Sequence, residues 1–205
     1  MPNLDKLRDH LSRRGYDVTI FDTQEEAGDY LNEKIDHRSV GVTGSVTLQK
    51  LDLAERLSRH NMVQWHWYNY VDPTESINSQ VFMTSVNAVT EDGVIVVVDG
   101  RGNRAAGMMY GHEELYIVIG TNKIVSTYEE AVDRAWNYCA PTNVTRMHGI
   151  TNGKHFNLPC VSDPEHKCQD CTDPDRVCRI QLDLHMRPNF IKRAEIIIIK
   201  EELGI

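Results

Sequence analysis

Hydrophobic positions in the first third of the chain follow helix and strand spacings in turn. Leucines three or four residues apart predict an amphipathic helix over residues 3–14, and the run DVTIF that follows is typical of a short strand. Thr23 and Glu26 stand at the spacing of a helix-capping box, so a second helix should run to about Ile35.

The next segments continue this alternation. SVGVT (39–43) is apolar and β-branched and predicts a strand, which Gly44 and Ser45 interrupt. Apolar residues at helical spacing from 48 to 57 predict a helix immediately afterwards. MVQWHWY (62–68) alternates like a strand, so its aromatic side chains are expected to pack in the core.

The middle and end of the chain are richer in strands. Three β-rich runs are expected over 81–86, 93–100 and 115–120, and the GNRAAGMMYG segment between the last two should form a helix or turn. A second capping box then opens a helix towards Cys139, a small buried hydrophobe, and Pro141 should end it. Two late strands are expected in the runs IQLDLHM and AEIIII.

Helices and strands therefore alternate along the whole chain. This order predicts an α/β fold with a largely parallel sheet flanked by helices. Because no internal repeat or linker interrupts it, residues 1–205 are expected to form a single domain, with a cysteine-rich loop at 160–178.

The charge balance and the lengths of the apolar runs limit the kinds of partner that the protein is expected to bind. Lys and Arg number 22 against 30 Asp and Glu, for a net charge of −8, and this balance disfavours binding to nucleic acid. The charged N-terminus has no signal-peptide core, and the longest apolar run, residues 196–199, is far too short to cross a bilayer. The chain is thus expected to be a cytoplasmic protein with no membrane contact.

Polar residues gather where the predicted strands end. The Gly44–Ser45 turn lies between a strand and a helix, where free backbone N–H groups suit a phosphate or carboxylate, although most such turns bind nothing. The carboxyl ends of neighbouring strands can share one crevice, so a binding site for a small anion is expected there. Its candidate residues are Gly44, Ser45, Asn87, Asp99, Gly102, Asn103, Arg104, Asn122 and Lys123.

Each side chain in this set has an expected role. Arg104 offers a planar fork for carboxylate or phosphate, and Lys123 a point charge. Asp99 is the candidate general base, if the protein is catalytic. The alternative is that these residue types simply build turns.

Taken together, these blocks resemble the LUD domain family (lactate-utilisation protein C-like). The stretches that carry the resemblance are GVTGSVTL, VFMTSVNAVTEDGVIVVVDGRGNRAAGMMYG, IVIGTNKIV, EEAVDRAWNYCAPTNVTRM and the late cysteine block with its terminal EELG. They cover most of the chain from about residue 40 onward.

The resemblance implies a fold similar to the sugar-phosphate isomerase and CoA-transferase group (NagB/RpiA-like). It also implies a role in the use of lactate or related organic acids, either as a protein that binds a small anion or as a non-catalytic accessory subunit that docks with iron–sulfur protein partners. It supplies no catalytic residues, so whether the protein is an enzyme stays open.

The cysteine block has the spacing C-x7-C-x2-C-x6-C, formed by Cys160, Cys168, Cys171 and Cys178. Four thiolates so close in sequence could bind zinc or an iron–sulfur cluster, although the spacing matches neither ferredoxin pattern. Reduced thiols that pack a loop, and disulfides or a redox switch, are the alternatives. Nearby aspartates argue against a low-pKa redox cysteine.

Overall fold

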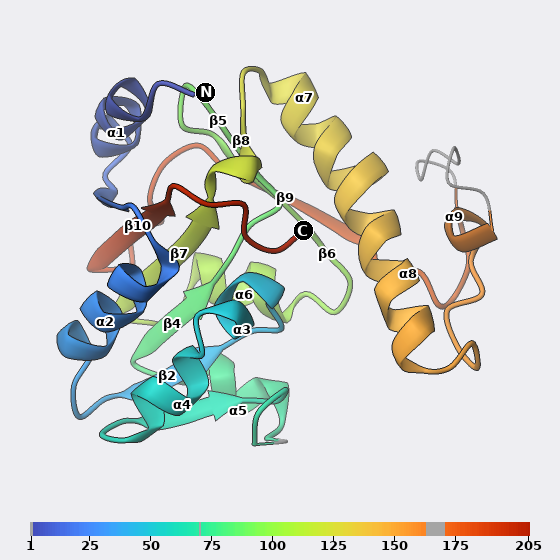
Figure 1. Cartoon of the computed structure of the whole chain (residues 1–205), viewed down its shortest axis with the longest axis horizontal. Helices are drawn as coiled ribbons and strands as arrows, with labels where there is room; N and C mark the ends of the chain where they lie inside the picture. The colour runs from blue at the N-terminus through green and yellow to red at the C-terminus, as the bar shows by residue number, and fades with distance from the viewer. Residues whose placement is uncertain (1, 70, 163–170) are drawn as a thin grey trace.

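The architecture is that of a computed structural model, which describes residues 2–69, 71–162 and 171–205. Its main sheet has six strands, all parallel, in the order β1-β10-β7-β4-β2-β3 (Figure 1). The α/β class and the largely parallel sheet are therefore confirmed. The strands are β1 Asp17–Phe21, β2 Ser39–Val42, β3 Met62–Trp65, β4 Val81–Thr84, β7 Glu114–Gly120 and β10 Arg193–Ile199.

A second sheet of four strands, in the order β8-β5-β6-β9, was not expected. The 93–100 run supplies its strand β6, which pairs antiparallel with both β5 and β9 instead of joining the main sheet. Because β6 is buried on both faces, its unbroken apolar run has the appearance of a central parallel strand. The strands are β5 Ala88–Thr90, β6 Ile95–Asp99, β8 Ile124–Val125 and β9 Ile180–Leu184.

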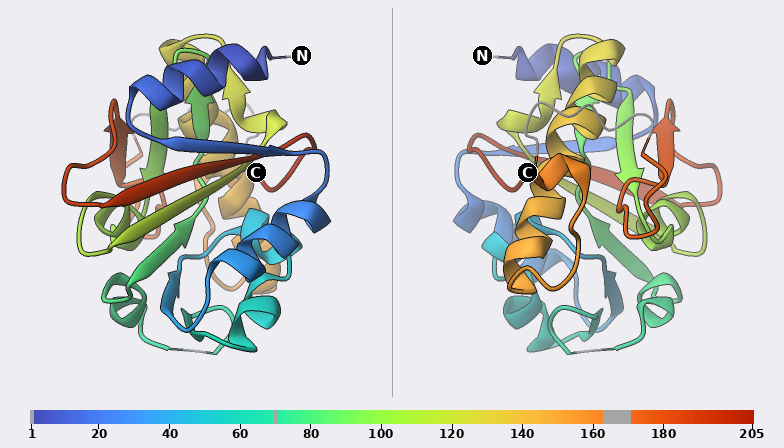
Figure 2. Two further views of the ribbon diagram at one scale, coloured as in Figure 1. Left: turned by 90° about the vertical axis from the view of Figure 1, so that its left-hand side faces the viewer. Right: turned by 90° about the vertical axis from the view of Figure 1, so that its right-hand side faces the viewer.

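Helices and the second sheet cover the main sheet in layers (Figures 1 and 2). Helices α2, α3 and α4 pack on one face, and α1, α6 and the second sheet pack on the other. The outer face of the second sheet packs against the long helix that runs through α7 (Tyr128–Asp133) and α8 (Ala140–Ile150). The helices outside the long helix are α1 Leu4–Arg13, α2 Gln24–Lys34, α3 Val46–Lys50, α4 Leu53–Ser58, α5 Pro73–Ile77, α6 Asn103–Met109 and α9 Pro159–Ser162.

Local sequence signals explain where two of the helices begin. Thr23 and Thr127 each accept a hydrogen bond from the backbone N–H three residues later, and the glutamate at that position bonds back to the cap. Both predicted capping boxes are thus confirmed. The helix predicted over 48–57 is instead two short ones, because Asp52 takes the left-handed conformation (φ +51°) between them.

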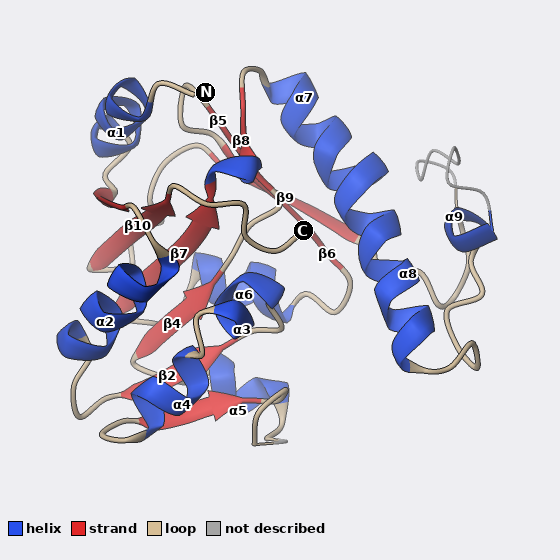
Figure 3. Cartoon of the chain, viewed as in Figure 1, coloured by secondary structure: helices blue, strands red, loops and turns tan. Residues whose placement is uncertain are grey.

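The expected end of a helix at Pro141 is wrong. Helix α7 (Tyr128–Asp133) continues through η2 (Arg134–Cys139), a π-helical turn, into α8 (Ala140–Ile150), and Figure 3 shows one uninterrupted helix. A proline lacks the backbone donor and crowds the preceding turn, but the wide π turn before it relieves this crowding. The Thr142 hydroxyl also donates to the Tyr138 carbonyl at 2.6 Å.

Among the described residues, no helix is long and apolar enough to span a membrane.

Candidate functional site

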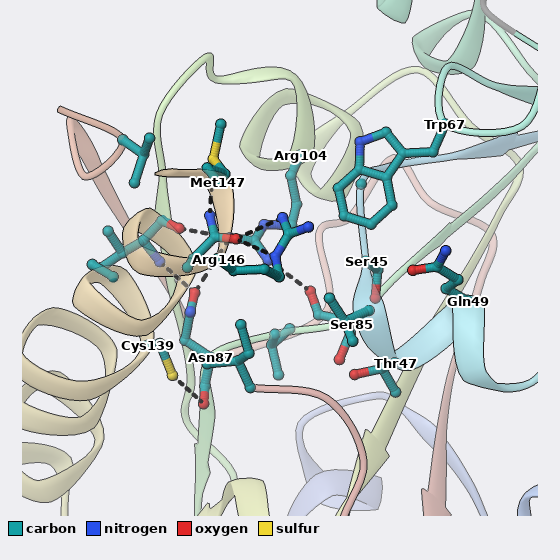
Figure 4. A pocket seen from close by; sticks show the side chains of 18 of the residues that line it. Ser45, Thr47, Gln49, Trp67, Ser85, Asn87, Arg104, Cys139, Arg146 and Met147 are labelled. Carbon is teal, nitrogen blue, oxygen red and sulfur yellow. Dashed lines mark hydrogen bonds between the residues drawn. The ribbon is translucent and has the colours of Figure 1, made fainter. Parts of the chain in front are cut away.

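A cavity of about 580 Å³ lies at the carboxyl ends of three neighbouring strands of the main sheet. The residues after β2 and β4, and those after β7, form one wall, and α8 forms the opposite wall (Figure 4). Of the predicted site residues, five line it: Gly44, Ser45, Asn87, Arg104 and Lys123. The structure therefore brings together groups that are up to about eighty positions apart in sequence.

Arg104 reaches the cavity from the first turn of α6. Its guanidinium donates to the Val98 carbonyl at 2.6 Å and, more weakly at 3.4 Å, to the Ser85 carbonyl and the Asn87 side chain. Burial lowers the pKa of Arg104, and the carboxylate of Asp99 opposes this shift. Because arginine starts from so high a pKa, the guanidinium still carries its charge at neutral pH.

Lys123 enters the same cavity from the turn that follows β7. Its Nζ donates to Ser85 Oγ and to the Val86 carbonyl, both at 3.0 Å, and the residue is only 3% exposed. Burial lowers the pKa of Lys123 to about 7; Cys139 works against the shift and Arg134 adds to it. At neutral pH the side chain is therefore close to the midpoint between ammonium and amine.

Two further arginines stand near these cations. Arg134, from the π turn, donates to the Asn87 and Asn122 carbonyls and contacts the Cys139 thiol. Arg146, from α8, donates to the Asn143 side chain and lies over the Trp67 ring, 5.2 Å from its centroid. No ion pair within 4 Å joins these two arginines, Arg104 or Lys123 to a carboxylate in the described part of the chain.

The Gly44–Ser45 turn forms the rim of the cavity beside an indole ring. A Cβ at Gly44 would stand 2.7 Å from the Trp67 ring, so only glycine lets the indole lie this close. Ser45 Oγ accepts the backbone N–H of Leu48 at 3.3 Å and caps α3. The turn thus both shapes the cavity wall and starts a helix.

The other predicted site residues do not line the cavity. The Asp99 carboxylate accepts the Ala105 backbone N–H at 3.0 Å, at the start of α6, and its strand, β6, belongs to the second sheet. The Asn122 side chain accepts the Leu203 N–H at 3.0 Å and holds the C-terminal segment. Gly102 takes a positive φ of +87° that glycine adopts readily, and Asn103 is the first residue of α6.

Sequence reasoning passed over several side chains that the fold brings to the cavity. Ser85 follows β4 directly, so its place after a strand was the available signal. The π turn and α8 bring in Cys139, Asn143, Arg146 and Met147, for which the sequence offers no comparable signal. Trp65 packs in the core as expected, whereas Trp67 is 38% exposed and lines the cavity.

His66, from the same aromatic run, also lines the cavity. Its Nδ1 is buried without a hydrogen-bond partner among the described residues. Burial, and secondarily Arg101, lowers the pKa of His66, so the ring is neutral at pH 7. It offers a hydrogen bond to a guest and no charge.

The cysteine block is described only in part. Cys160 and Cys178 are buried in the apolar cluster under α8, and Cys171 is partly exposed. Cys168 lies outside the described residues. Over the described ranges, no three His, Cys, Asp or Glu side chains are grouped so as to hold a metal ion. The three described cysteines therefore do not by themselves fit zinc or a cluster.

Comparisons with known proteins agree with this architecture. The family model described as the LUD domain matches residues 4–199. A crystal structure of a DUF162 family protein from Deinococcus radiodurans is similar over 96% of this chain and 95% of that one, with a TM-score of 0.55 and 15% sequence identity, which supports the fold. The comparison with curated proteins gives no match. The chain belongs to the LUD domain family, whose members are related to lactate utilisation.

Proposed function

We propose that this protein binds a small organic acid, with a carboxylate or phosphate group, in the cavity between the strand ends and α8. The observation that carries the proposal is that Arg104 and Lys123 line one cavity and that no carboxylate of the described residues forms an ion pair with either within 4 Å. The Asp99 carboxylate acts on Arg104 only from beyond that distance. Buried charges are normally paired, because removing them from water is costly. A bound anion would supply the missing charge.

The cavity also has the right size and character for such a guest. About 580 Å³ lies within the range of small-molecule sites, and one sector is apolar while another presents convergent donors. Arg104 offers a planar donor pair and Lys123 a point charge, which suits one carboxylate or phosphate group. The apolar side chains of α8, such as Met147, would pack on the rest of the molecule.

Titration calorimetry tests this function with L-lactate, pyruvate and inorganic phosphate as probes. We expect one site in the wild-type protein and binding weakened at least tenfold in Arg104→Gln and Lys123→Met, because each loses a buried cation. Lys50→Met and Arg59→Gln, on the exposed surface, are the matched controls and should bind as the wild type does. Circular dichroism should show that all four variants fold. Equal affinity in the cavity and control variants would rule the proposal out.

A metal bound by the cysteine block remains a separate proposal. Cys160 and Cys178 are brought to one apolar cluster, but a set of four ligands would need Cys168. Zinc and iron analysis of protein purified anaerobically tests it, with Cys168→Ser as the variant. A stoichiometric metal that the variant loses would support the site, and the same metal content in both proteins would exclude it.

The alternative function is docking with an iron–sulfur oxidoreductase partner. An exposed aromatic pair favours a protein contact: Tyr110 and Phe190 stack at 4.3 Å between ring centroids, and both are more than half exposed. Pull-down with iron–sulfur proteins encoded beside this chain tests the proposal. Capture that Tyr110→Ser and Phe190→Ser abolish would support it, and no capture at micromolar concentration would count against it.

A further inference from the structure

The amine of Lys123 is held more tightly than anion binding requires. A lysine that only attracts an anion can keep a mobile, hydrated ammonium group, but Lys123 is 3% exposed and its Nζ is fixed by Ser85 Oγ and the Val86 carbonyl. A neutral amine has two N–H groups and one lone pair. The two acceptors account for both N–H groups, which leaves the lone pair for a group in the cavity that Lys123 lines.

The charges around this amine favour its neutral form. Arg104 and Arg134 act on it as cations, and Cys139 is the group that opposes them. No carboxylate in the described residues forms an ion pair with it, so nothing nearby holds the proton strongly. With a pKa of about 7, a large share of Lys123 is a free amine at physiological pH. Nucleophilic lysines are activated in this way, by desolvation and neighbouring cations.

The same cavity can orient an electrophile against this amine. Arg104 can hold a carboxylate, and its guanidinium and Lys123 Nζ contact the same residue, Ser85. In a 2-oxo acid the carbonyl carbon is bonded directly to the carboxylate carbon. A carboxylate on Arg104 would therefore bring the adjacent carbonyl towards Nζ.

We propose that Lys123 forms a Schiff base with a short-chain 2-oxo acid bound in this cavity. The Nζ lone pair attacks the ketone carbon to give a carbinolamine, a proton moves from nitrogen to oxygen, and loss of water forms the C=N bond. No oxidant or reductant is consumed, since amine and ketone give imine and water. Ser85 Oγ, hydrogen-bonded to Nζ, is placed to relay the proton. The inference rests on the proposed function, because the acid must first bind.

Reductive trapping tests the covalent step. The wild-type protein is incubated with pyruvate and sodium cyanoborohydride, digested and mapped by tandem mass spectrometry. We expect one N-carboxyethyl group on Lys123 and background labelling of the exposed Lys50. L-Lactate, which has a hydroxyl group in place of the ketone, should give no adduct but should protect Lys123 when present in excess. Acetone, which has no carboxylate, should label Lys123 at least tenfold less than pyruvate does.

A conservative variant separates the two proposals. Lys123→Arg keeps a cation and removes the nucleophile, so it should still bind L-lactate in the calorimeter and lose the adduct. If pyruvate binds the wild-type protein but Lys123 stays unmodified, the Schiff base is excluded and the proposal of anion binding stands. The same conclusion follows if Lys123 is labelled no faster than Lys50. If no acid binds at all, both proposals fail. Mass-spectrometric mapping of the labelled wild-type protein tests the Schiff base even if a variant does not fold.

Discussion

At the scale of single residues, the cavity holds two buried cations, Arg104 and Lys123, that form no carboxylate ion pair within 4 Å in the described part of the chain. Arg104 is satisfied only by carbonyl and amide oxygens, and Lys123 by a hydroxyl and a carbonyl. Neutral acceptors compensate part of the lost hydration of a charge, and a carboxylate would compensate more. The protonation of Lys123 is therefore expected to depend on whether a ligand is present.

Binding of L-lactate should weaken as the pH rises through 7. The pKa of Lys123 in the free protein is about 7, so the ammonium form that attracts a carboxylate prevails at pH 6 and is scarce at pH 8.5. If only that form binds, affinity falls by up to about 30-fold over this range, at one decade per pH unit above the pKa. Calorimetry at the two pH values measures this change. Lys123→Met should show no comparable dependence, and an equal decline in that variant would assign the effect to another group.

The low pKa of Lys123 should also make the stability of the folded protein depend on pH. Stability should rise with pH, whereas the affinity for L-lactate falls. Between pH 7 and 10.5 an unfolded lysine is protonated while Lys123 is neutral, so the unfolded state binds more protons and folding stability rises with pH. Lys123→Met removes this contribution. The wild type should therefore gain stability relative to the variant as the pH rises. In urea unfolding, the free energy of unfolding of the variant minus that of the wild type should decrease by about 2–4 kcal/mol from pH 7 to pH 10. A constant difference would mean that Lys123 keeps its ordinary pKa.

Gly44 should matter for the shape of the cavity. In Gly44→Ala the new methyl group would meet the Trp67 ring at 2.7 Å, so the indole must shift and its contact with Arg146 changes. We expect a loss of about 1–2 kcal/mol in stability and about tenfold in affinity for L-lactate. Gly149→Ala is the control: nothing lies within 4 Å of its added Cβ, and a helix gains about 0.5–1 kcal/mol from this change. Similar results for the two variants would contradict the role given to Gly44.

The residues of the site were predictable only where they follow strands. Asn87 and Lys123 stand just after strands of the main sheet, so their meeting follows from the rule for parallel sheets. Asp99 fits the same pattern in sequence, but its carboxylate accepts the backbone N–H of Ala105 at the start of α6. Arg146 comes from a helix more than twenty residues after Lys123, and only the path of that helix brings it to the cavity.

At the scale of elements, the capping boxes predicted helix starts reliably, but the sequence did not show which strands belong to which sheet. Both capping boxes begin helices where the sequence places them. The second sheet was missed because β5 has three residues and β8 two, too few for an alternating pattern. The helix end predicted at Pro141 was wrong because the effect of this proline depends on the π turn before it, which the local sequence does not show.

The two capping boxes form a matched pair for mutation. Thr127→Ala and Thr23→Ala should each lower stability by about 1 kcal/mol, through the loss of one side-chain bond to a helix N–H. Only Thr127 begins the helix that carries Arg134 and Cys139, so Thr127→Ala alone should weaken L-lactate binding, by about two- to fivefold. Urea unfolding and calorimetry measure the two effects. An equal loss of affinity in Thr23→Ala would show that the long helix has no special part.

At the scale of the whole molecule, the cavity joins three layers of the fold. Its walls come from the main sheet, from the second sheet through Val98, and from α8. Ligand binding should therefore stabilise the folded state as one unit. A ligand at 100 times its Kd adds about 2.7 kcal/mol, which for a chain of this size raises Tm by about 5–10 °C. Differential scanning fluorimetry with L-lactate checks the shift, and Arg104→Gln should show much less of it at the same concentration.

The most direct test of the central claim, that the cavity holds a small organic acid, is a crystal structure of the protein grown with saturating pyruvate. We predict density for one acid in the cavity, with its carboxylate within hydrogen-bond distance of the Arg104 guanidinium and its carbonyl carbon next to Lys123 Nζ. An empty cavity in well-ordered crystals at that concentration, or an acid bound only elsewhere on the protein, would contradict the account.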